Sequence, residues 1–449
     1  MASHLAVHGL ATRTAAAAGC GSLLLGKQLR GGGRTRVTSE AGTLRRLAIP
    51  VFLPAAVFGV GQGAAVPVVA LQARELGASA GGAGLIVALL GLGMVLGDLP
   101  AGRIVTRIGE RAAVLLGSGV GAVGTALCLL SWTPVVLAIG VGMYGVATAV
   151  WALARQAYII ETVPVALRAR ALSAMAGLSR VGTLVGPFLG AGVVYLLGPR
   201  GGFLVELVAV IIAGALMAGM PAVESDRGGG RPAQSLLAVL VAHRRVLSTL
   251  GTSALVMGAS RASRTAVLPL WADHIGLDAT TTSLLFGVGA AVDVALSYPA
   301  GRWMDLRGRR PVAVGSLVTF AAAHVALPLT GSVVALGAVA VLMGVANGLS
   351  NGLIMTLGAD SAPEEGRAEF LGAFRLCHDT GALAGPLVLA AVTAVATLGL
   401  GSIALGALAA LGAGGMARWV PRRPRADSRR SPGNARDQPS EHSSGKRGG

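Results

Sequence analysis

The sequence predicts an all-α membrane protein with twelve transmembrane helices in two pseudo-symmetric six-helix bundles. Of the 449 residues, 53% are hydrophobic and only 13% are charged, which is too little charge to cover an aqueous surface. Long apolar runs recur, and a membrane-spanning helix needs about 20 apolar residues. The short basic segment PAGRIVTRIGER, residues 100–111, returns 199 positions later as PAGRWMDLRGRR, residues 299–310.

Charged residues and Gly/Pro-rich turns divide the apolar sequence into spans. A polar Gly/Arg segment around residues 224–232 separates the spans six and six. We therefore expect an N-terminal bundle at 47–221, a cytoplasmic linker at 222–246 and a C-terminal bundle at 247–420. The expected spans are 47–71, 81–101, 112–131, 135–158, 171–197, 203–221, 247–272, 281–303, 312–330, 333–357, 370–394 and 397–419.

Arginines are concentrated in one set of the connecting turns. They cluster in the turns between spans 2 and 3, 4 and 5, and 8 and 9, and in the linker, whereas the alternate turns hold only Arg74 and Arg200. Short cytoplasmic loops retain Arg and Lys. The pattern predicts a multi-pass cell-membrane protein with both termini in the cytoplasm.

The two ends of the chain differ in composition from the spans. Residues 421–449 are rich in Arg, Ser, Pro and Gly and are expected to form a disordered basic tail. Residues 1–46 are expected to be a disordered leader, with translation starting near Val37.

Several function classes are excluded by what the sequence lacks. The net charge of +17 is dispersed, without the reading helix or aromatic platform of a nucleic-acid binder. GSLLLGKQ, residues 21–28, has Gln28 where a phosphate loop needs Ser or Thr. Cys20, Cys128 and Cys377 are far apart, which favours no metal or disulfide site. Without an HExxH, a GxSxG or a Cys/His cluster, we expect no enzyme, no cofactor and no metal.

The 199-residue offset recurs beyond the basic segments. Pro164 and Arg168 correspond to Pro363 and Arg367, and RVGTLVGPFLG in span five corresponds to DTGALAGPLVL in span eleven. Shared spacing of several motifs indicates duplication of a six-helix unit. In membranes such repeats commonly build transporters with a substrate site between the halves.

On these motifs, residues 47–420 resemble the major facilitator superfamily. The second basic segment fits that family's GxxxDxxGRR loop pattern at Gly301, Asp305, Gly308, Arg309 and Arg310. The first segment has Thr106 in place of Asp and Glu110 in place of Arg. Its remaining elements are Gly102, Arg103, Arg107, Gly109 and Arg111, with Asp98 one turn earlier as a substitute carboxylate.

The resemblance implies that these two segments form a conformational latch. Glycines let two helices and a tight turn approach closely, and a carboxylate beside arginines forms bonds that one conformation has and another loses. The alternative is that the arginines only fix the topology.

The GxxxGP element of span five resembles the motif of antiporters and exporters in this superfamily. Small residues spaced by four allow close helix contact, and a proline bends a span so that two packings can exchange. Ordinary transmembrane packing is the alternative interpretation. Ala191 replaces the last Gly of the motif. The helix-bend residues of both copies are Gly182, Gly186, Pro187, Gly381, Gly385 and Pro386.

Charges at mid-membrane are functional candidates, because each costs about 2.5–3.5 kcal/mol on insertion scales. Arg261 and Arg264 of span seven lie three residues apart on one face, and Asp293 of span eight is at a similar depth. We expect a salt bridge from Asp293 to one of these arginines. The alternative is that the triad only holds the C-terminal half together.

Span eleven carries a second group of charges. Arg375 and Asp379, four apart, are expected to pair along one face, with His378 pointing about 100° away from Asp379. Arg180 and Glu206 lie in spans five and six. Arg155, at the end of span four, would approach a substrate or extend its charge to the interface.

In the family that the chain resembles, spans one, four, seven and ten line the central cavity. Carried over to this chain, the polar cavity residues are Gln62, Arg155, Arg261, Arg264, Asn347 and Asn351. Proton coupling needs a carboxylate or histidine whose proton affinity changes with access to water. The candidates are Asp293, Asp379, Glu206 and His378.

The sequence thus predicts a monomeric secondary transporter, resembling drug/proton antiporters, that uses protons for multidrug efflux of small amphipathic compounds across the lipid bilayer. One alternative is an importer of a small organic solute, for which the paired arginines would suit an anion. Another is a membrane sensor without transport.

Overall fold

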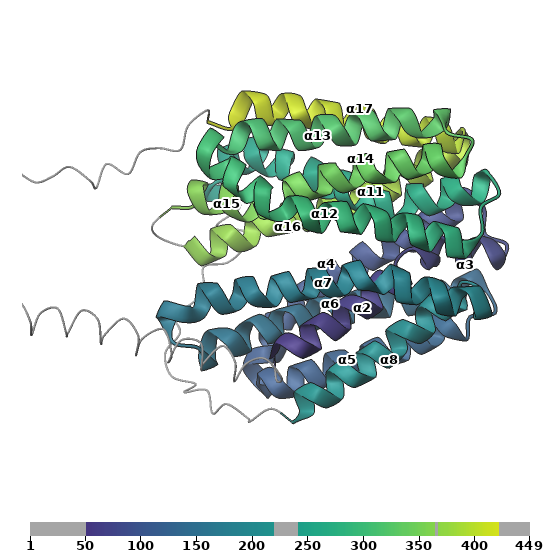
Figure 1. Ribbon diagram of the computed structural model, residues 1–449. Helices are drawn as coiled ribbons and strands as arrows, with labels where there is room; N and C mark the ends of the chain where they lie inside the picture. Colours follow the sequence, from purple (N-terminus) through teal and green to yellow (C-terminus); the bar gives the residue numbers. More distant parts are fainter. Residues whose placement is uncertain (1–50, 220–240, 364–366, 422–449) are drawn as a thin grey trace, which may run out of the picture.

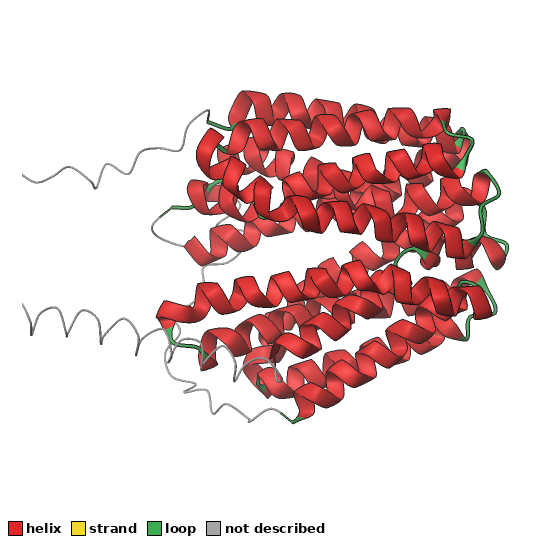
Figure 2. Cartoon of the chain, viewed as in Figure 1, coloured by secondary structure: helices red, strands yellow, loops and turns green. Residues whose placement is uncertain are grey.

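The computed structural model describes residues 51–219, 241–363 and 367–421, which are almost entirely helical and contain no strand (Figure 2). The predicted leader, most of the linker and the basic tail lie outside these residues.

The first half of the chain crosses the expected membrane six times, and its first crossing is broken at Val66–Pro67. Pro67 lacks the N–H that a continuous helix would use. The helices are α2 (Leu53–Ala65) with α3 (Val68–Glu75), α4 (Ala80–Ile108), α5 (Glu110–Leu129), α6 (Pro134–Thr162), α7 (Val165–Leu197) and α8 (Arg200–Ala218).

The second half also crosses six times, and its fourth crossing is broken at Asn351–Gly352, where Gly352 is left-handed. A short α10 (Arg244–Val246) and a π-helical turn, Leu247–Gly251, precede the first crossing of this half. The helices are α11 (Thr252–His274), α12 (Ala279–Arg307), α13 (Arg309–Ala326), α14 (Val333–Ser350) with α15 (Leu353–Ser361), α16 (Arg367–Val395) and α17 (Leu398–Trp419).

Eleven helices of the described residues are long and apolar enough to cross a membrane. The remaining crossing is α11, which has the length but carries Arg261, Arg264 and Asp273. Large apolar side chains such as Tyr195, Leu329 and Leu411 are at least three-quarters exposed on the outside of the bundle. Hydrocarbon solvates such a surface and water does not.

The two basic segments are helical, which corrects the expectation that they form turns. α4 runs through Arg103 to Ile108 and α12 through Arg302 to Arg307, so each helix continues past its apolar part. The turn is one glycine in each half, Gly109 at φ 82° and Gly308 at φ 88°. Only glycine adopts this backbone freely. We call the end of the bundle that carries these two glycines the PAGR end, and the other the distal end.

The repeat is visible in the packing within each half. A Cβ atom on Gly182 of α7 would overlap the carbonyl oxygen of Ala56 on α2, and one on Gly381 of α16 would overlap that of Leu255 on α11. Each pair of equivalent positions is 199 residues apart. Gly186 and Gly385 make the same kind of contact one turn later. The glycines therefore bring helix backbones together inside each half.

The two halves meet along α4 with α16 and along α7 with α12. A Cβ on Gly91 of α4 would lie 2.9 Å from Leu383 Cα, and one on Gly287 of α12 would lie 2.7 Å from the ring of Phe188. At the distal end, Arg74 of α3 pairs with Asp273 of α11 at 2.9 Å. This ion pair joins equivalent positions of the repeat, which are 199 residues apart.

The same four helices have open space near the PAGR end. No atom of a neighbouring helix lies within 4 Å of a Cβ built on Gly102, Gly177, Gly301 or Gly372, one from each helix. The ribbons of the two halves also lie farther apart at this end than at the end where α3 lies (Figure 1). The halves are thus closed at the distal end and separated at the PAGR end.

Gly186→Ala should lower the free energy of unfolding by about 1–3 kcal/mol, because the added methyl group overlaps the Val60 carbonyl oxygen of α2 and must displace backbone. Thermal unfolding in detergent measures the change. Gly192→Ala in the same helix is the matched control, since its Cβ would meet nothing within 4 Å. Equal stability of the two variants would contradict the close α2–α7 contact.

Candidate functional site

A hydrogen-bonded network of α11, α12 and α14 lies inside the second half. The Arg261 guanidinium donates to the Ser350 hydroxyl at 2.5 Å and to the Asn351 side-chain oxygen at 3.2 and 3.3 Å. The Asn351 amide nitrogen donates to Asp293 at 2.5 Å, and that of Asn347 donates to the other Asp293 oxygen at 2.6 Å. We call Arg261, Asp293, Asn347, Ser350 and Asn351 the amide bridge.

The amide bridge corrects the expected salt bridge between Asp293 and an arginine. Asp293 and Arg261 are linked through Asn351, whose oxygen faces the cation and whose nitrogen faces the carboxylate. Asn supplies both a donor and an acceptor, so it satisfies both ions at once. Arg264 interacts with Asp293 only through the longer-range electrostatic field.

Arg264 is held differently from Arg261, although both lie on α11. Its guanidinium carbon lies 5.9 Å from the centre of the Phe286 ring, within the range of a cation–π contact. Its buried Nε has no hydrogen-bond partner in the described part of the chain. The structure therefore leaves hydrogen-bonding capacity of Arg264 unused.

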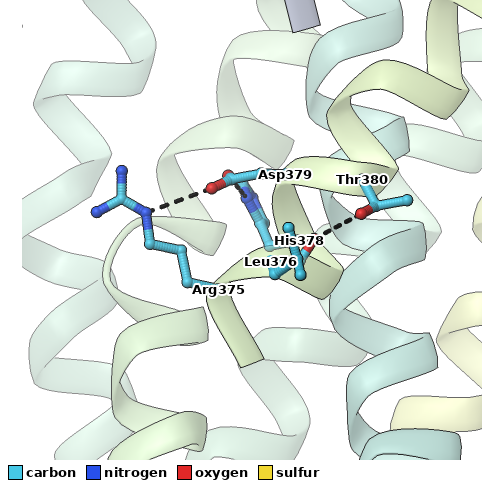
Figure 3. Close-up of polar contacts among 5 residues, drawn as sticks. All are labelled: Arg375, Leu376, His378, Asp379 and Thr380. Carbon is cyan, nitrogen blue, oxygen red and sulfur yellow. Dashed lines mark hydrogen bonds and ion pairs between the residues drawn. The ribbon is translucent and has the colours of Figure 1, made fainter. Parts of the chain in front are cut away.

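A second cluster lies on α16 (Figure 3). The Arg375 Nε contacts an Asp379 oxygen at 3.3 Å, the i,i+4 ion pair that the spacing predicts. His378 was expected to point away from Asp379, and this prediction is wrong. Its Nδ1 lies 3.0 Å from the other Asp379 oxygen. The Asp379 carboxyl is short enough to turn back to the ring of the preceding residue. Arg375 and His378 thus hold both carboxylate oxygens.

Asp98 of α4 brings the first half into this cluster. It interacts electrostatically with both Arg375 and Asp379. The first half therefore adds a second carboxylate to the electrostatic surroundings of Asp379.

Two cavity candidates of the first half, Arg155 and Gln62, are inside the protein. Arg155 on α6 is only 8% exposed, and its guanidinium carbon lies 4.4 Å from the centre of the Trp151 ring. Its Nε and Nη1 are buried without a hydrogen-bond partner among the described residues. The side chain therefore folds onto Trp151 and does not extend to an interface. Gln62 is half-buried on α2.

Glu206 lies apart from the other acidic candidates, inside the first half. Its carboxylate is fully enclosed, lies against Gly61 of α2 and interacts electrostatically with Tyr144 of α6. A small cavity of about 20 Å³ adjoins these helices.

The latch candidates are divided between packed and exposed positions. Arg309 pairs with Asp360 of α15 at 2.8 Å, whereas Asp305, expected beside the arginines, is exposed. In the first half, Arg111 donates to the carbonyl oxygen of Ala218 at the end of α8. Arg103 and Arg107 are exposed, and Arg310 is half-buried. These contacts stay within one half, as the separated PAGR end requires.

Sequence reasoning missed Ser350, which accepts a hydrogen bond from Arg261 within the amide bridge. It also missed Ser297, whose hydroxyl accepts one from the Asn351 amide nitrogen. Serine is common in transmembrane helices, so neither residue stood out. Within the described ranges no three His, Cys, Asp or Glu side chains gather as a metal site would require.

The sequence profile of the Major Facilitator Superfamily matches residues 51–260 and 250–444, which together cover most of the chain. The chain is a member of the major facilitator superfamily. Members of this family are transporters of small molecules and not enzymes, and they are often coupled to protons.

Among curated relatives, an uncharacterized MFS-type transporter of Mycobacterium tuberculosis is 28% identical over 271 residues in each of two strains. The match covers 59% of this chain and 36% of the relative.

Solved structures of the family share the fold at low sequence identity. The nucleoside transporter NupG superposes with a TM-score of 0.70 at 11% identity, and the match covers 82% of this chain and 98% of the NupG chain. A D-xylose–proton symporter gives 0.64 at 16% identity, with 83% and 97% covered. A POT family transporter crystallised with 5-aminolevulinic acid gives 0.65 at 12% identity, with 82% and 94% covered.

Asn351→Ala removes one hydrogen-bond partner from Arg261 and one from Asp293. It should lower the free energy of unfolding by about 1–3 kcal/mol for each of these two charged groups. Denaturation of the purified protein measures the loss. Thr356→Ala is the control, because the Thr356 hydroxyl bonds only to carbonyls of its own turn. A variant as stable as this control would show that the bridge does not join Arg261 to Asp293.

Proposed function

We propose that this protein is a proton-coupled exporter of small amphipathic compounds that works by alternating access. The observation that carries the proposal is the contact between the halves, which is closed by the Arg74–Asp273 pair at the distal end and open at the PAGR end. Such an arrangement gives one side of a membrane access to the space between two repeats.

The charge pattern supports a cell-membrane orientation with the PAGR end in the cytoplasm. Arginine-rich short loops stay on the cytoplasmic side, and Gly109 and Gly308 follow arginine-rich helix ends. In this orientation the conformation faces the cytoplasm, where an exporter takes up its cargo. A monomer contains both halves of such a site.

Asp379 is the proposed proton carrier. It is held by Arg375 and His378 on α16 and interacts electrostatically with Asp98 on α4. Protonation of Asp379 would weaken its attraction to Arg375 and remove its repulsion of Asp98. Both changes alter the electrostatic interaction between α4 and α16, which belong to different halves, so proton binding and closure of the PAGR end would be coupled.

The carboxylates elsewhere would have other roles. Asp293 has both oxygens bonded to amides, which favours a structural role within the second half. Glu206 lies inside the first half, away from α16.

Import of a small organic solute is the second candidate, favoured by the incompletely bonded arginines at mid-membrane. The direction of accumulation separates it from export. A sensor without transport would accumulate the compound in neither direction.

Asp379→Asn should reduce accumulation driven by an imposed pH gradient at least tenfold, while counterflow exchange of the same compound persists. The assay uses inside-out vesicles and a panel of amphipathic antibiotics and dyes. The reason is that the amide keeps the shape of the site but carries no proton.

Asp278→Asn is the matched control, because Asn caps α12 as well as Asp does. Failure of the unmodified protein to accumulate any compound under the gradient would contradict export. Full gradient-driven accumulation by Asp379→Asn would remove Asp379 from the mechanism.

A further inference from the structure

Arg261 lies in the electrostatic field of two other arginines, one from each half. The electrostatic neighbours of Arg261 include Arg264, one turn further along α11, and Arg180 on α7 of the other half. Like charges repel, and the repulsion is strongest where water is excluded. A cluster of this kind is unfavourable unless an anion compensates it.

Within the described ranges, the carboxylate among the electrostatic neighbours of Arg261 is Asp293. Three positive charges and one negative charge leave an excess of two. Asp293 is also occupied, since each of its oxygens accepts a short bond from an asparagine amide. It therefore offers no direct ion pair to the arginines.

The hydrogen-bonding capacity of the arginines is unequally used. Arg261 donates to Ser350, Asn351 and the Asn347 carbonyl oxygen, so it is fixed to the second half. Arg264 is placed by the Phe286 ring, and its buried Nε has no acceptor in the described chain. The planar guanidinium fork suits a carboxylate, sulfonate or phosphate, which it binds with two parallel hydrogen bonds.

We propose that the cargo carries an anionic group, that this group binds at Arg264 of the second half, and that Arg180 of the first half adds electrostatic attraction. The proposal rests on the proposed transport function and names the chemical class of its substrate, an amphipathic organic anion. Arg261 contributes its field but keeps its bonds to the amide bridge.

This site would also link binding to the conformational change. Without an anion, Arg180 and Arg261 repel each other across the separated halves. A bound anion attracts arginines of both halves and so favours their approach at the PAGR end. The ligand would then bind the closed arrangement better than the open one, which is what a ligand needs in order to shift the equilibrium.

Three probes with one naphthalene body test the charge. They are naphthalene-2-sulfonate, the neutral 2-naphthalenemethanol and the cationic 2-naphthylmethylammonium, each titrated into the full-length purified protein. Binding is measured as the rise in thermal unfolding temperature. We expect the sulfonate alone to stabilise the protein. Equal stabilisation by the neutral alcohol, or none by the sulfonate, would overturn the proposal.

Arg264→Gln and Arg180→Gln should each weaken sulfonate binding at least tenfold. Arg264→Lys should restore part of it, because the charge returns without the fork. Arg418→Gln removes the same charge from the exposed end of α17 and should bind like the unmodified protein. Unweakened sulfonate binding in both of the first two variants, in folded protein, would overturn the proposal.

Counterflow separates this inference from the transport function. Charge-selective binding that depends on Arg264 and Arg180, without exchange of labelled naphthalene-2-sulfonate in proteoliposomes, would support the anion site and contradict transport. Exchange of the neutral probe with no competition by the sulfonate would support transport and overturn the anion site.

Discussion

Hydrocarbon cannot solvate charge, and this constraint determines how the interior of the protein is arranged. A charged side chain inside a membrane protein must find its partner on another helix or in an aqueous space. In the second half, Asn351 and Asn347 provide the partners for Arg261 and Asp293. On α16, Arg375 and His378 provide them for Asp379. Where the described part of the chain provides too few acceptors, as around the Nε of Arg264, a ligand can supply them.

The contacts inside each half differ from those between the halves. Gly182 and Gly381 let α7 and α16 touch the backbones of α2 and α11, so each half packs without room for side chains at these points. Close packing of this kind leaves little room for rearrangement inside each half. The halves meet through the distal parts of four helices and the exposed Arg74–Asp273 pair. An exposed ion pair contributes about 0–1 kcal/mol, so the distal contact depends mainly on the packing of these helices.

The sequence predicted the elements that repeat. Because the 199-residue offset relates two copies, it indicated in advance that Gly109 and Gly308 are equivalent, and both have a positive φ. The apolar runs predicted the crossings, but their ends shifted because α4 and α12 continue through their basic segments. Hydropathy marks where a helix leaves the hydrocarbon, which is not where it ends.

Side-chain partners were predicted less well than helices. Helix spacing correctly paired Arg375 with Asp379, because i,i+4 neighbours share a face. It misplaced His378, whose direction depends on a rotamer, and it missed Asn351 as the link between Arg261 and Asp293. A contact between helices depends on their rotation about their own axes, which one sequence does not encode locally.

The central claim is that the two halves alternate between contact at the distal end and contact at the PAGR end. Distances between spin labels test this claim most directly. In protein with its cysteines replaced, one pair is placed at Gly102 and Gly372 near the PAGR end and another at Leu85 and Val395 near the distal end, on α4 and α16 in both cases. Addition of a transported compound should shorten the first distance while it lengthens the second. Distances that stay fixed under every condition, or that change in the same direction, would contradict alternating access.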